Sequence, residues 1–275
     1  MLLVAIVILA GCATSDRRNP KDPLEPLNRK VFAFNDELDT HVLRPIATGY
    51  VNVTPLPARV GTSNFFGNLE DVWIGVNNLL QGKPGDAASD AGRFLVNSTV
   101  GILGFFDVAS ELGIEKHDED FGQTLGRWGV GNGPYLVLPF FGPRTLRDTG
   151  GLIVDSYASP LGAIQDIPVR NSVRGLKVVN DRANLLGAET TLTEAALDKY
   201  SFVRDFYLKH RQSQILDGKR PKDDDDDDSM LAPLFQRVDG EGYFATRRLT
   251  SVLAKADFDR HDAVLDQRKQ NDPTQ

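Results

Sequence analysis

Residues 122–148 read GQTLGRWGVGNGPYLVLPFFGPRTLRD, and this stretch constrains the architecture more than any other. Between Arg127 and Arg144 lie sixteen residues without a charge, whereas a helix that spans a bilayer needs about 20 apolar residues. Two prolines, Pro134 and Pro139, would also break a regular helix. Sharp turns are possible at the glycines of the stretch, Gly126, Gly129, Gly131, Gly133 and Gly142. We therefore expect a hairpin that is either buried in protein or sunk partway into lipid.

The composition is that of a folded protein with one large domain or two small ones. The chain has 275 residues, of which 41% are hydrophobic and 25% charged, close to globular averages. Six aspartates at 223–228 supply most of the net charge of -7, so the rest of the chain is nearly neutral. A nucleic-acid binder needs a basic surface, and the charge distribution argues against that class.

The N-terminus has the features of a lipoprotein signal. Residues 2–11, LLVAIVILAG, are apolar, too short to span a bilayer and of a length typical of signal peptides. They end at Cys12, the only cysteine, in a sequence, LAGC, that resembles a bacterial lipobox. In such signals the peptide is cut before the cysteine, which carries covalent lipid, and two or more acyl chains anchor a protein firmly. We expect a signal peptide at 1–11 and a lipidated tether at 12–21.

The residue after the cysteine indicates to which membrane a lipoprotein would be sorted. It is Ala13 rather than aspartate, and by analogy with enteric lipoproteins this indicates the outer membrane. The competing interpretation makes Cys12 a buried cysteine in a helix.

Amphipathic periodicity predicts two helices in the first third of the chain. One begins near Pro26 and ends at Arg44-Pro45. Residues 51–63 are expected to be extended or turning, because Pro55 and Pro57 exclude a regular helix. Ser63 or Asn64 then caps a second helix that stops at Gly82-Lys83-Pro84. Its apolar face is interpreted as core (Phe65, Leu69, Val72, Val76, Leu79), and its polar face lies opposite (Asn68, Glu70, Asp71, Asn77).

Two further apolar segments are also too short to cross a membrane. Residues 94–106 carry no charge and are flanked by Arg93 and Asp107, and residues 149–164 carry one, Asp155. A soluble protein could bury these segments as core. The alternative is a protein embedded in one leaflet, where irregular backbone is tolerated if it is covered by protein or lines a cavity.

The remainder of the chain is more conventional. Helical periodicity predicts amphipathic helices at 169–186 and 197–211. Residues 217–275 contain the run of aspartates at 223–228, whose like charges prevent folding, so we expect an acidic linker and a mobile tail.

The sequence lacks the groupings that catalysis requires, and we expect no enzyme. None of the four histidines has metal-ligand spacing, no G-x-S-x-G elbow is present, and no glycine-rich loop ends in Gly-Lys-Ser or Gly-Lys-Thr. The acidic turn at 117–120 is better interpreted as solvated than as a cation site. A lipolytic enzyme is therefore the weakest of the functional hypotheses.

Several motifs, in consistent order over residues 22–211, resemble the MlaA (VacJ) lipoproteins. The N-terminal ones are Asp22-Pro23-Leu24-Glu25 with Asn28-Arg29, Arg59 to Phe65 including Asn64, and Arg93-Phe94 with Asn97 to Gly101. The strongest lie in and before the hairpin: Phe121 to Gly126, Gly131 to Tyr135, Leu138-Pro139, Gly142-Pro143 and Arg147-Asp148.

The resemblance implies an all-α fold: a ring-like bundle of amphipathic and membrane-embedded helices with a glycine/proline-rich hairpin, around a central channel. Residues 22–216 would form this domain. It would lie in the periplasmic leaflet of the outer membrane beside a trimeric porin. Phospholipid misplaced in the outer leaflet would pass through the channel to a soluble periplasmic lipid carrier. No metal or other cofactor is implied apart from the covalent lipid on Cys12.

The hairpin is the candidate wall or gate of that channel, formed by Gly129, Gly131, Gly133, Pro134, Tyr135, Pro139 and Gly142. We expect Gly131 and Gly133 to act as its hinge, and valine at both positions to impair removal of outer-leaflet phospholipid. The alternative is a non-catalytic scaffold or tether of the cell envelope. A channel predicts a polar path inside apolar outer faces, whereas a scaffold predicts a filled core.

Overall fold

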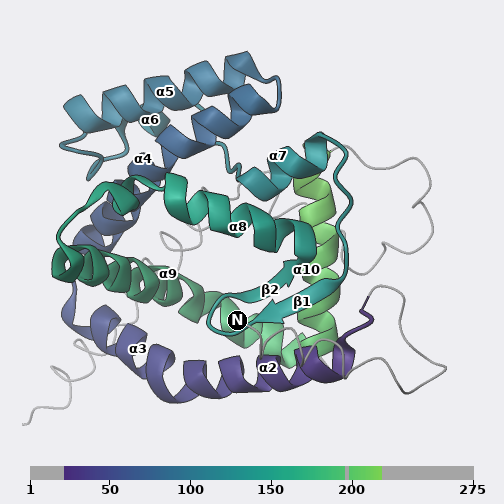
Figure 1. Cartoon of the computed structure of the whole chain (residues 1–275). Coiled ribbons are helices and arrows are strands. Elements are labelled where there is room, and N and C mark those ends of the chain that lie inside the picture. The colour runs from purple at the N-terminus through teal and green to yellow at the C-terminus, as the bar shows by residue number, and fades with distance from the viewer. Residues whose placement is uncertain (1–21, 196–197, 219–275) are drawn as a thin grey trace, which may run out of the picture. The chain divides into compact units, whose positions relative to one another are not determined.

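The computed structural model describes residues 22–195 and 198–218, with side chains described at 22–187 and 198–218. All of these residues except Gly218 belong to one unit of the chain, which ends at Asp217. Helices dominate it, and one small two-stranded sheet is present (Figure 1). The predicted all-α fold class is confirmed.

The first helical run continues past the predicted break. Helix α2 (Glu25–Leu38) leads into a π-helical segment, η1 (Asp39–Leu43), and then into α3 (Arg44–Val53). The prediction that Arg44-Pro45 ends the helix was wrong. Pro45 lies in the first turn of α3, directly after the wider π-helical turn, where a missing N–H and a bulky ring are tolerated.

Helix α4 (Leu56–Leu80) also starts earlier than predicted. Pro55 is its N-cap residue and Pro57 lies in its first turn, so both prolines initiate the helix rather than exclude it. The extended segment predicted at 51–63 is therefore wrong, and Ser63 and Asn64 lie inside α4 instead of capping it. The predicted end is correct, since Gly82 has a positive φ of 78° directly after the helix.

Helix α5 (Pro84–Thr99) returns along α4 (Figure 1). Asn78 Nδ2 donates to Asp90 Oδ2 (2.7 Å) and Asn68 Nδ2 donates to Ser98 Oγ (2.9 Å). The earlier residue of α4, Asn68, contacts the later residue of α5, and Asn78 contacts the earlier one, so the two helices are antiparallel. A turn then leads to the short helix α6 (Val108–Glu111).

Residues 121–145 form a helix and a hairpin. Helix α7 (Phe121–Arg127) is followed by strands β1 (Tyr135–Leu138) and β2 (Gly142–Thr145), which pair antiparallel with Tyr135 opposite Thr145. The predicted hairpin is thus confirmed.

Helices complete the described chain. They are α8 (Leu146–Ala158), the 3-10 segment η2 (Pro160–Ala163), α9 (Ile167–Ala195) and α10 (Lys199–Ile215). Both of the amphipathic helices predicted after residue 168 are present. Within the described ranges, no helix combines the length and the apolar character needed to cross a membrane.

The prediction for the faces of α4 was wrong at most positions, although Glu70 is exposed as expected. The residues assigned to the polar face are buried at Asn68, Asp71 and Asn77, while Val72 and Leu79, assigned to the core, are 41% and 59% exposed. The helical periodicity of apolar residues identifies the two faces of a helix, but it does not show which face packs against the rest of the protein.

Candidate functional site

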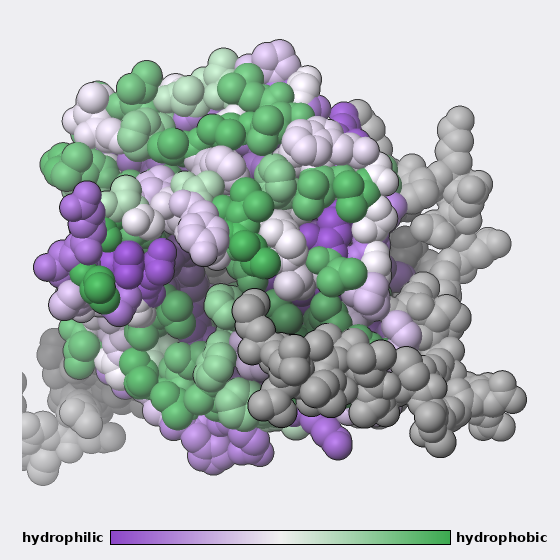
Figure 2. Space-filling view, in the orientation of Figure 1, coloured by the Kyte–Doolittle hydropathy of each residue, from purple (hydrophilic) through white to green (hydrophobic). Residues whose placement is uncertain are grey.

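The interior of the described region is mainly polar and its surface is rich in large apolar side chains. Among the described residues, buried polar and charged residues outnumber buried hydrophobic ones. Exposed large hydrophobic residues occur on α2, η1, α3, α4, α5, α8 and α9 and in several connecting segments, and apolar side chains cover much of the face shown in Figure 2. A soluble monomer rarely exposes large contiguous apolar patches, and such surfaces usually contact protein or lipid.

One buried polar cluster joins the N-terminal helix to the hairpin. Asn28 of α2 donates from Nδ2 to Tyr135 O (3.0 Å) and accepts at Oδ1 from Val137 N (2.9 Å). Its amide thus pairs with the edge of β1 as a neighbouring strand would. Nδ2 also donates to Asp22 Oδ1 (2.8 Å), whose other oxygen accepts from the hydroxyl of Tyr200.

A second asparagine of α2 repeats this arrangement two helical turns later. Asn35 Nδ2 donates to Leu138 O, and Phe140 N donates to Asn35 Oδ1, each at 2.9 Å. Phe140 lies at the tip of the hairpin with a positive φ of 68°, which is unusual for a residue other than glycine. Asn28 and Asn35 together fix the whole length of β1 against α2.

A small apolar cluster closes this region. The rings of Tyr135 and Tyr200 pack edge to face with centroids 6.4 Å apart, and Val137 is buried with them. Burial, followed by the neighbouring charge of Asp22, raises the pKa of the Tyr135 hydroxyl above its usual value. The ring is therefore neutral at physiological pH.

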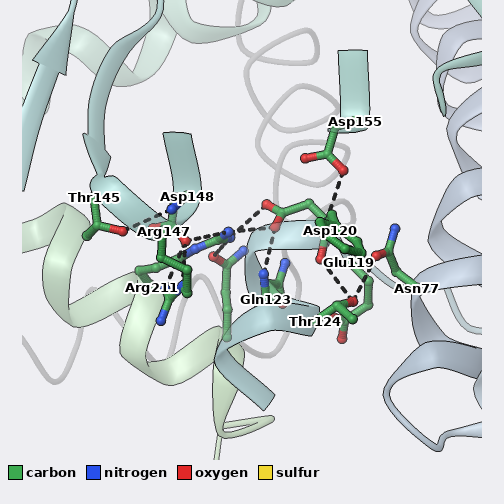
Figure 3. A network of polar contacts seen from close by, with 12 residues as sticks. Asn77, Glu119, Asp120, Gln123, Thr124, Thr145, Arg147, Asp148, Asp155 and Arg211 are labelled. Atoms are coloured by element: carbon green, nitrogen blue, oxygen red, sulfur yellow. Dashed lines mark hydrogen bonds and ion pairs between the residues drawn. The ribbon is translucent and has the colours of Figure 1, made fainter. Parts of the chain in front are cut away.

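A second polar cluster lies at the base of the hairpin, where β2, α7, α8 and α10 meet (Figure 3). Arg211 of α10 contacts both oxygens of Asp120, and its Nη2 donates to Asp148 Oδ1 (3.2 Å). Arg147 also reaches Asp148 Oδ1 (2.8 Å from Nη2), and its Nη1 donates to Asn132 Oδ1 (2.6 Å) in the glycine-rich loop.

The ionisation of Asp148 is set by these contacts. Burial opposes the charge, but Arg211, the Tyr207 hydroxyl (2.6 Å from Oδ2) and Arg147 outweigh it and hold the pKa below its usual value. Asp148 N also donates to Thr145 Oγ1 (3.2 Å), the N-cap of α8. The aspartate is therefore a buried anion that several elements share.

A third cluster fixes the segment after α5. Buried Arg93 donates from Nη2 to Asp107 Oδ1 (2.9 Å), and Lys116 contacts Asp71. His117 Nδ1 lies 2.8 Å from Asp90 Oδ1, and this hydrogen bond raises the pKa of His117 above its ordinary value against the opposing effect of burial. Charged groups thus occupy positions that apolar side chains fill in most proteins.

The polar clusters among the described residues do not have the composition of a metal site. Among the residues that the structure describes, no group of three histidine, cysteine or carboxylate side chains is placed to hold a metal ion. The paired charges are used to join helices to one another.

Comparison with known proteins places the chain in a family. The model of the MlaA lipoprotein matches residues 20–214, which is well over half of the sequence. The chain belongs to the MlaA lipoprotein family.

Curated MlaA proteins align over most of their length. "Intermembrane phospholipid transport system lipoprotein MlaA" of Escherichia coli (strain K12) is 38% identical over 214 residues, covering 76% of this chain and 84% of that protein. Its namesake in Haemophilus influenzae is 35% identical, covering 79% and 90% respectively. A solved chain from work described as "Structural basis for maintenance of bacterial outer membrane lipid asymmetry" is 35% identical with a TM-score of 0.63, and covers 72% of this chain and all of that one.

Most of the MlaA motif residues named from sequence lie in or beside these clusters. Asp22 and Asn28 belong to the first, with Pro23 beside them. Arg29 flanks the same cluster, where its guanidinium lies over the Tyr200 ring and bonds Asp198. Arg147 and Asp148 form the second cluster.

Asn64 and Phe65 lie apart from both. Asn64 Nδ2 donates to Phe105 O (3.2 Å) beyond α5, and the Phe65 ring packs on Phe66. Cys12 lies outside the described residues, so its lipidation stays a prediction.

The hairpin residues named from sequence differ in their constraints. Gly129, Gly133 and Gly142 have positive φ, and a Cβ on Gly133 would lie 2.9 Å from Leu146 Cβ. Gly131 has open space around it. Tyr135 is buried, Pro134 accepts from Leu146 N (3.0 Å) and Pro139 is exposed. The hinge role of Gly131 and Gly133 stays a hypothesis.

Sequence reasoning missed Asn35, Arg211, Tyr207 and Tyr200 as parts of these clusters. Each lies on a helix that was interpreted as ordinary and is distant in sequence from the hairpin. Their only signal was a polar or phenolic side chain on an otherwise apolar face.

Proposed function

We propose that this chain is an outer-membrane lipoprotein that removes mislocalised phospholipid from the outer leaflet and passes it to a soluble periplasmic carrier. Return of that lipid to the inner membrane would maintain lipid asymmetry. The proposal extends to this chain what its relatives' names state, transport of phospholipid between membranes. The observation that carries it is the polar interior under an apolar surface.

The physical problem in such transport is the headgroup. Moving a charged or polar group through hydrocarbon without hydrogen bonds costs several kcal/mol or more. A polar path inside the protein would remove that penalty, while the acyl chains stay with apolar surface. We propose that the polar interior provides this path as an amphipathic channel.

The hairpin is proposed as the wall or gate of the channel. It is held to α2 by Asn28 and Asn35 and to α10 through Asp148. A movement of either helix would therefore be transmitted to the hairpin. Gly129, Gly133 and Gly142, with positive φ, are the points at which its backbone is specialised.

The anchor and partners complete the proposal. Covalent lipid on Cys12 would hold the chain to the periplasmic leaflet, and no metal or nucleotide is required. A trimeric porin is the proposed neighbour in the membrane, and a soluble lipid carrier the proposed acceptor in the periplasm.

The test in cells compares outer-leaflet phospholipid in three strains: wild type, a deletion of this chain, and the deletion complemented with Cys12→Ala. The proposal predicts phospholipid accumulation in the deletion strain and failure of Cys12→Ala to reverse it. Equal outer-leaflet phospholipid in the wild-type and deletion strains would contradict the transport function.

A further inference from the structure

Helix α9 carries a line of charged side chains along one side. They are spaced three or four residues apart, which places them next to one another on a helix. The line consists of Arg170, Arg174, Lys177 and Asp181. Lys177 Nζ contacts Glu70 Oε1 of α4 (3.0 Å) and Asp181 Oδ2 (2.7 Å). This side of α9 therefore faces α4, and the charge of Lys177 is matched by two carboxylates.

The first two members of the line differ from the other arginines already described. Within the described part of the chain, no carboxylate pairs with Arg170 or Arg174, whereas the buried arginines of the polar clusters each contact an aspartate. Asp166, one turn before Arg170, accepts from Val169 N (2.9 Å) instead. The Nε–H of Arg170 is buried and has no hydrogen-bond partner among the described residues. Because like charges one turn apart repel and buried donors need partners, this pair is suited to bind an anion.

The charged line borders a confined space. The side chain of Asp181 is 50% exposed, yet burial among protein atoms raises its pKa above the ordinary value, and the neighbouring charge of Glu70 acts in the same direction. A group that is both accessible to water and surrounded by protein lies in a recess. Arg174 Nη2 borders the same side of the helix, 4.0 Å from the place of a Cβ on Gly162 in η2. Figure 2 shows a hollow beside α9 with hydrophilic side chains at its edge.

The shape of this place restricts what can bind there. A headgroup or a small anion can enter a recess between two helices, whereas the surface of a folded protein cannot. Apolar side chains also adjoin the arginines, since Ile167 and Val169 in the first turn of α9 are 58% and 51% exposed. A ligand that has an anionic group next to hydrocarbon would use both features.

We propose that Arg170 and Arg174 bind the phosphate of a phospholipid headgroup. A guanidinium presents parallel N–H donors that match two phosphate oxygens, and it is the side chain best suited to such recognition. A free phosphate ion offers the same chemistry, but the exposed Ile167 and Val169 favour a lipid, whose acyl chains would contact them. The proposal deepens the proposed function and rests on it for the source of the phosphate.

The test counts lipid that stays bound to the purified protein. Native mass spectrometry of protein released from detergent micelles resolves bound lipid by mass, and titration gives an apparent dissociation constant. The probes are dioleoyl phosphatidylcholine and dioleoylglycerol, which has the same acyl chains and no phosphate. We expect wild-type protein to bind phosphatidylcholine in preference to dioleoylglycerol. Equal binding of the two probes would overturn the proposal.

Two double variants locate the site. In Arg170→Gln with Arg174→Gln, the apparent dissociation constant for phosphatidylcholine is expected to rise about tenfold or more, because both charge-assisted contacts are lost. The matched control is Lys30→Gln with Arg127→Gln, which removes the same charge from α2 and α7 and should bind like wild type. Wild-type affinity in the Arg170/Arg174 variant, or an equal loss in the control, would overturn the proposal.

Thermal stability separates binding from folding. Without lipid, loss of two charges that repel each other should leave the melting temperature unchanged or higher. A lower melting temperature would mean that protein groups hold the two arginines, and it would overturn the proposal.

Two further measurements separate the source of the phosphate from the transport function. Inorganic phosphate should not displace bound phosphatidylcholine, and displacement at a comparable affinity would overturn the assignment to a lipid. Binding that depends on the two arginines, without any transfer of phospholipid to a carrier, would count against the proposed function alone.

Discussion

Asn28 shows how one side chain can take the place of a β-strand. Its amide satisfies Tyr135 O and Val137 N, two groups of β1 that would otherwise be buried without partners. An unsatisfied buried donor or acceptor costs about 1–3 kcal/mol. At the residue scale, side-chain amides therefore decide whether the hairpin can be buried at all.

Replacing Asn28 by alanine should destabilise the fold. The change leaves two backbone groups and one oxygen of Asp22 without their partner, so we expect the free energy of unfolding to fall by at least about 2 kcal/mol. Chemical denaturation in detergent micelles measures it. Lys30→Ala, at an exposed position of the same helix, serves as the control, and equal stability of the two variants would refute this role of Asn28.

The two proposed hinge glycines should respond differently to alanine. Gly133 has a positive φ and its Cβ would meet Leu146, whereas Gly131 has open space and no positive φ. We expect Gly133→Ala to lower the free energy of unfolding by roughly 1 kcal/mol or more, and with it the melting temperature. Gly131→Ala should leave both nearly unchanged. Calorimetry of both variants decides the matter, and a larger effect at Gly131 would contradict it.

At the scale of elements, the sequence predicted which segments are helical more accurately than it predicted where the helices start or which of their faces are buried. The hairpin, the C-terminal end of α4 and the later helices followed from glycine and proline positions and from periodicity. Pro45 and Pro57 misled because proline marks a first turn as often as an end, and only the chain before it decides which. The faces of α4 were reversed because Val72 and Leu79 look like core unless the surrounding medium is known.

The polar clusters could be predicted only in part, because their members lie far apart in the sequence. Asp22, Asn28, Arg147 and Asp148 were found through the family resemblance, but their partners on α10 are about 60 to 180 residues distant, as for Tyr207 with Asp148 and Tyr200 with Asp22. No local pattern brings such residues together.

The contact between α5 and the segment after α6 should depend on pH. Hydrogen bonding to Asp90 raises the folded-state pKa of His117, and Asp86 and Glu115 act in the same direction. A raised pKa means that the stabilisation is fully present below the unfolded value of about 6.5, and is lost as pH rises through the folded value.

We therefore expect His117→Asn to be most destabilising near pH 5.5 and least near pH 9, measured as free energy of unfolding. His41→Asn is the control, because His41 is an exposed side chain in η1. A cost of His117→Asn that does not change over this pH range would exclude the His117–Asp90 pair as its cause.

At the scale of the whole described unit, polar clusters join the helices and apolar side chains face outward. Removing one member of a buried ion pair commonly costs 3–5 kcal/mol, because the other charge stays buried. Such an interior is an inefficient way to stabilise a soluble protein. It suits a protein whose outer faces are covered by acyl chains and whose inner groups meet a headgroup.

The transport function we propose requires that this chain speed the passage of phospholipid from a membrane to a soluble carrier. The direct test is reconstitution of the lipidated protein in vesicles with labelled phospholipid and the periplasmic carrier, measuring the rate at which label appears on the carrier. We expect faster transfer with the protein than without it, and a slower rate in Asn28→Ala protein that is still folded. Equal rates with and without folded, membrane-inserted wild-type protein would rule out the transport function.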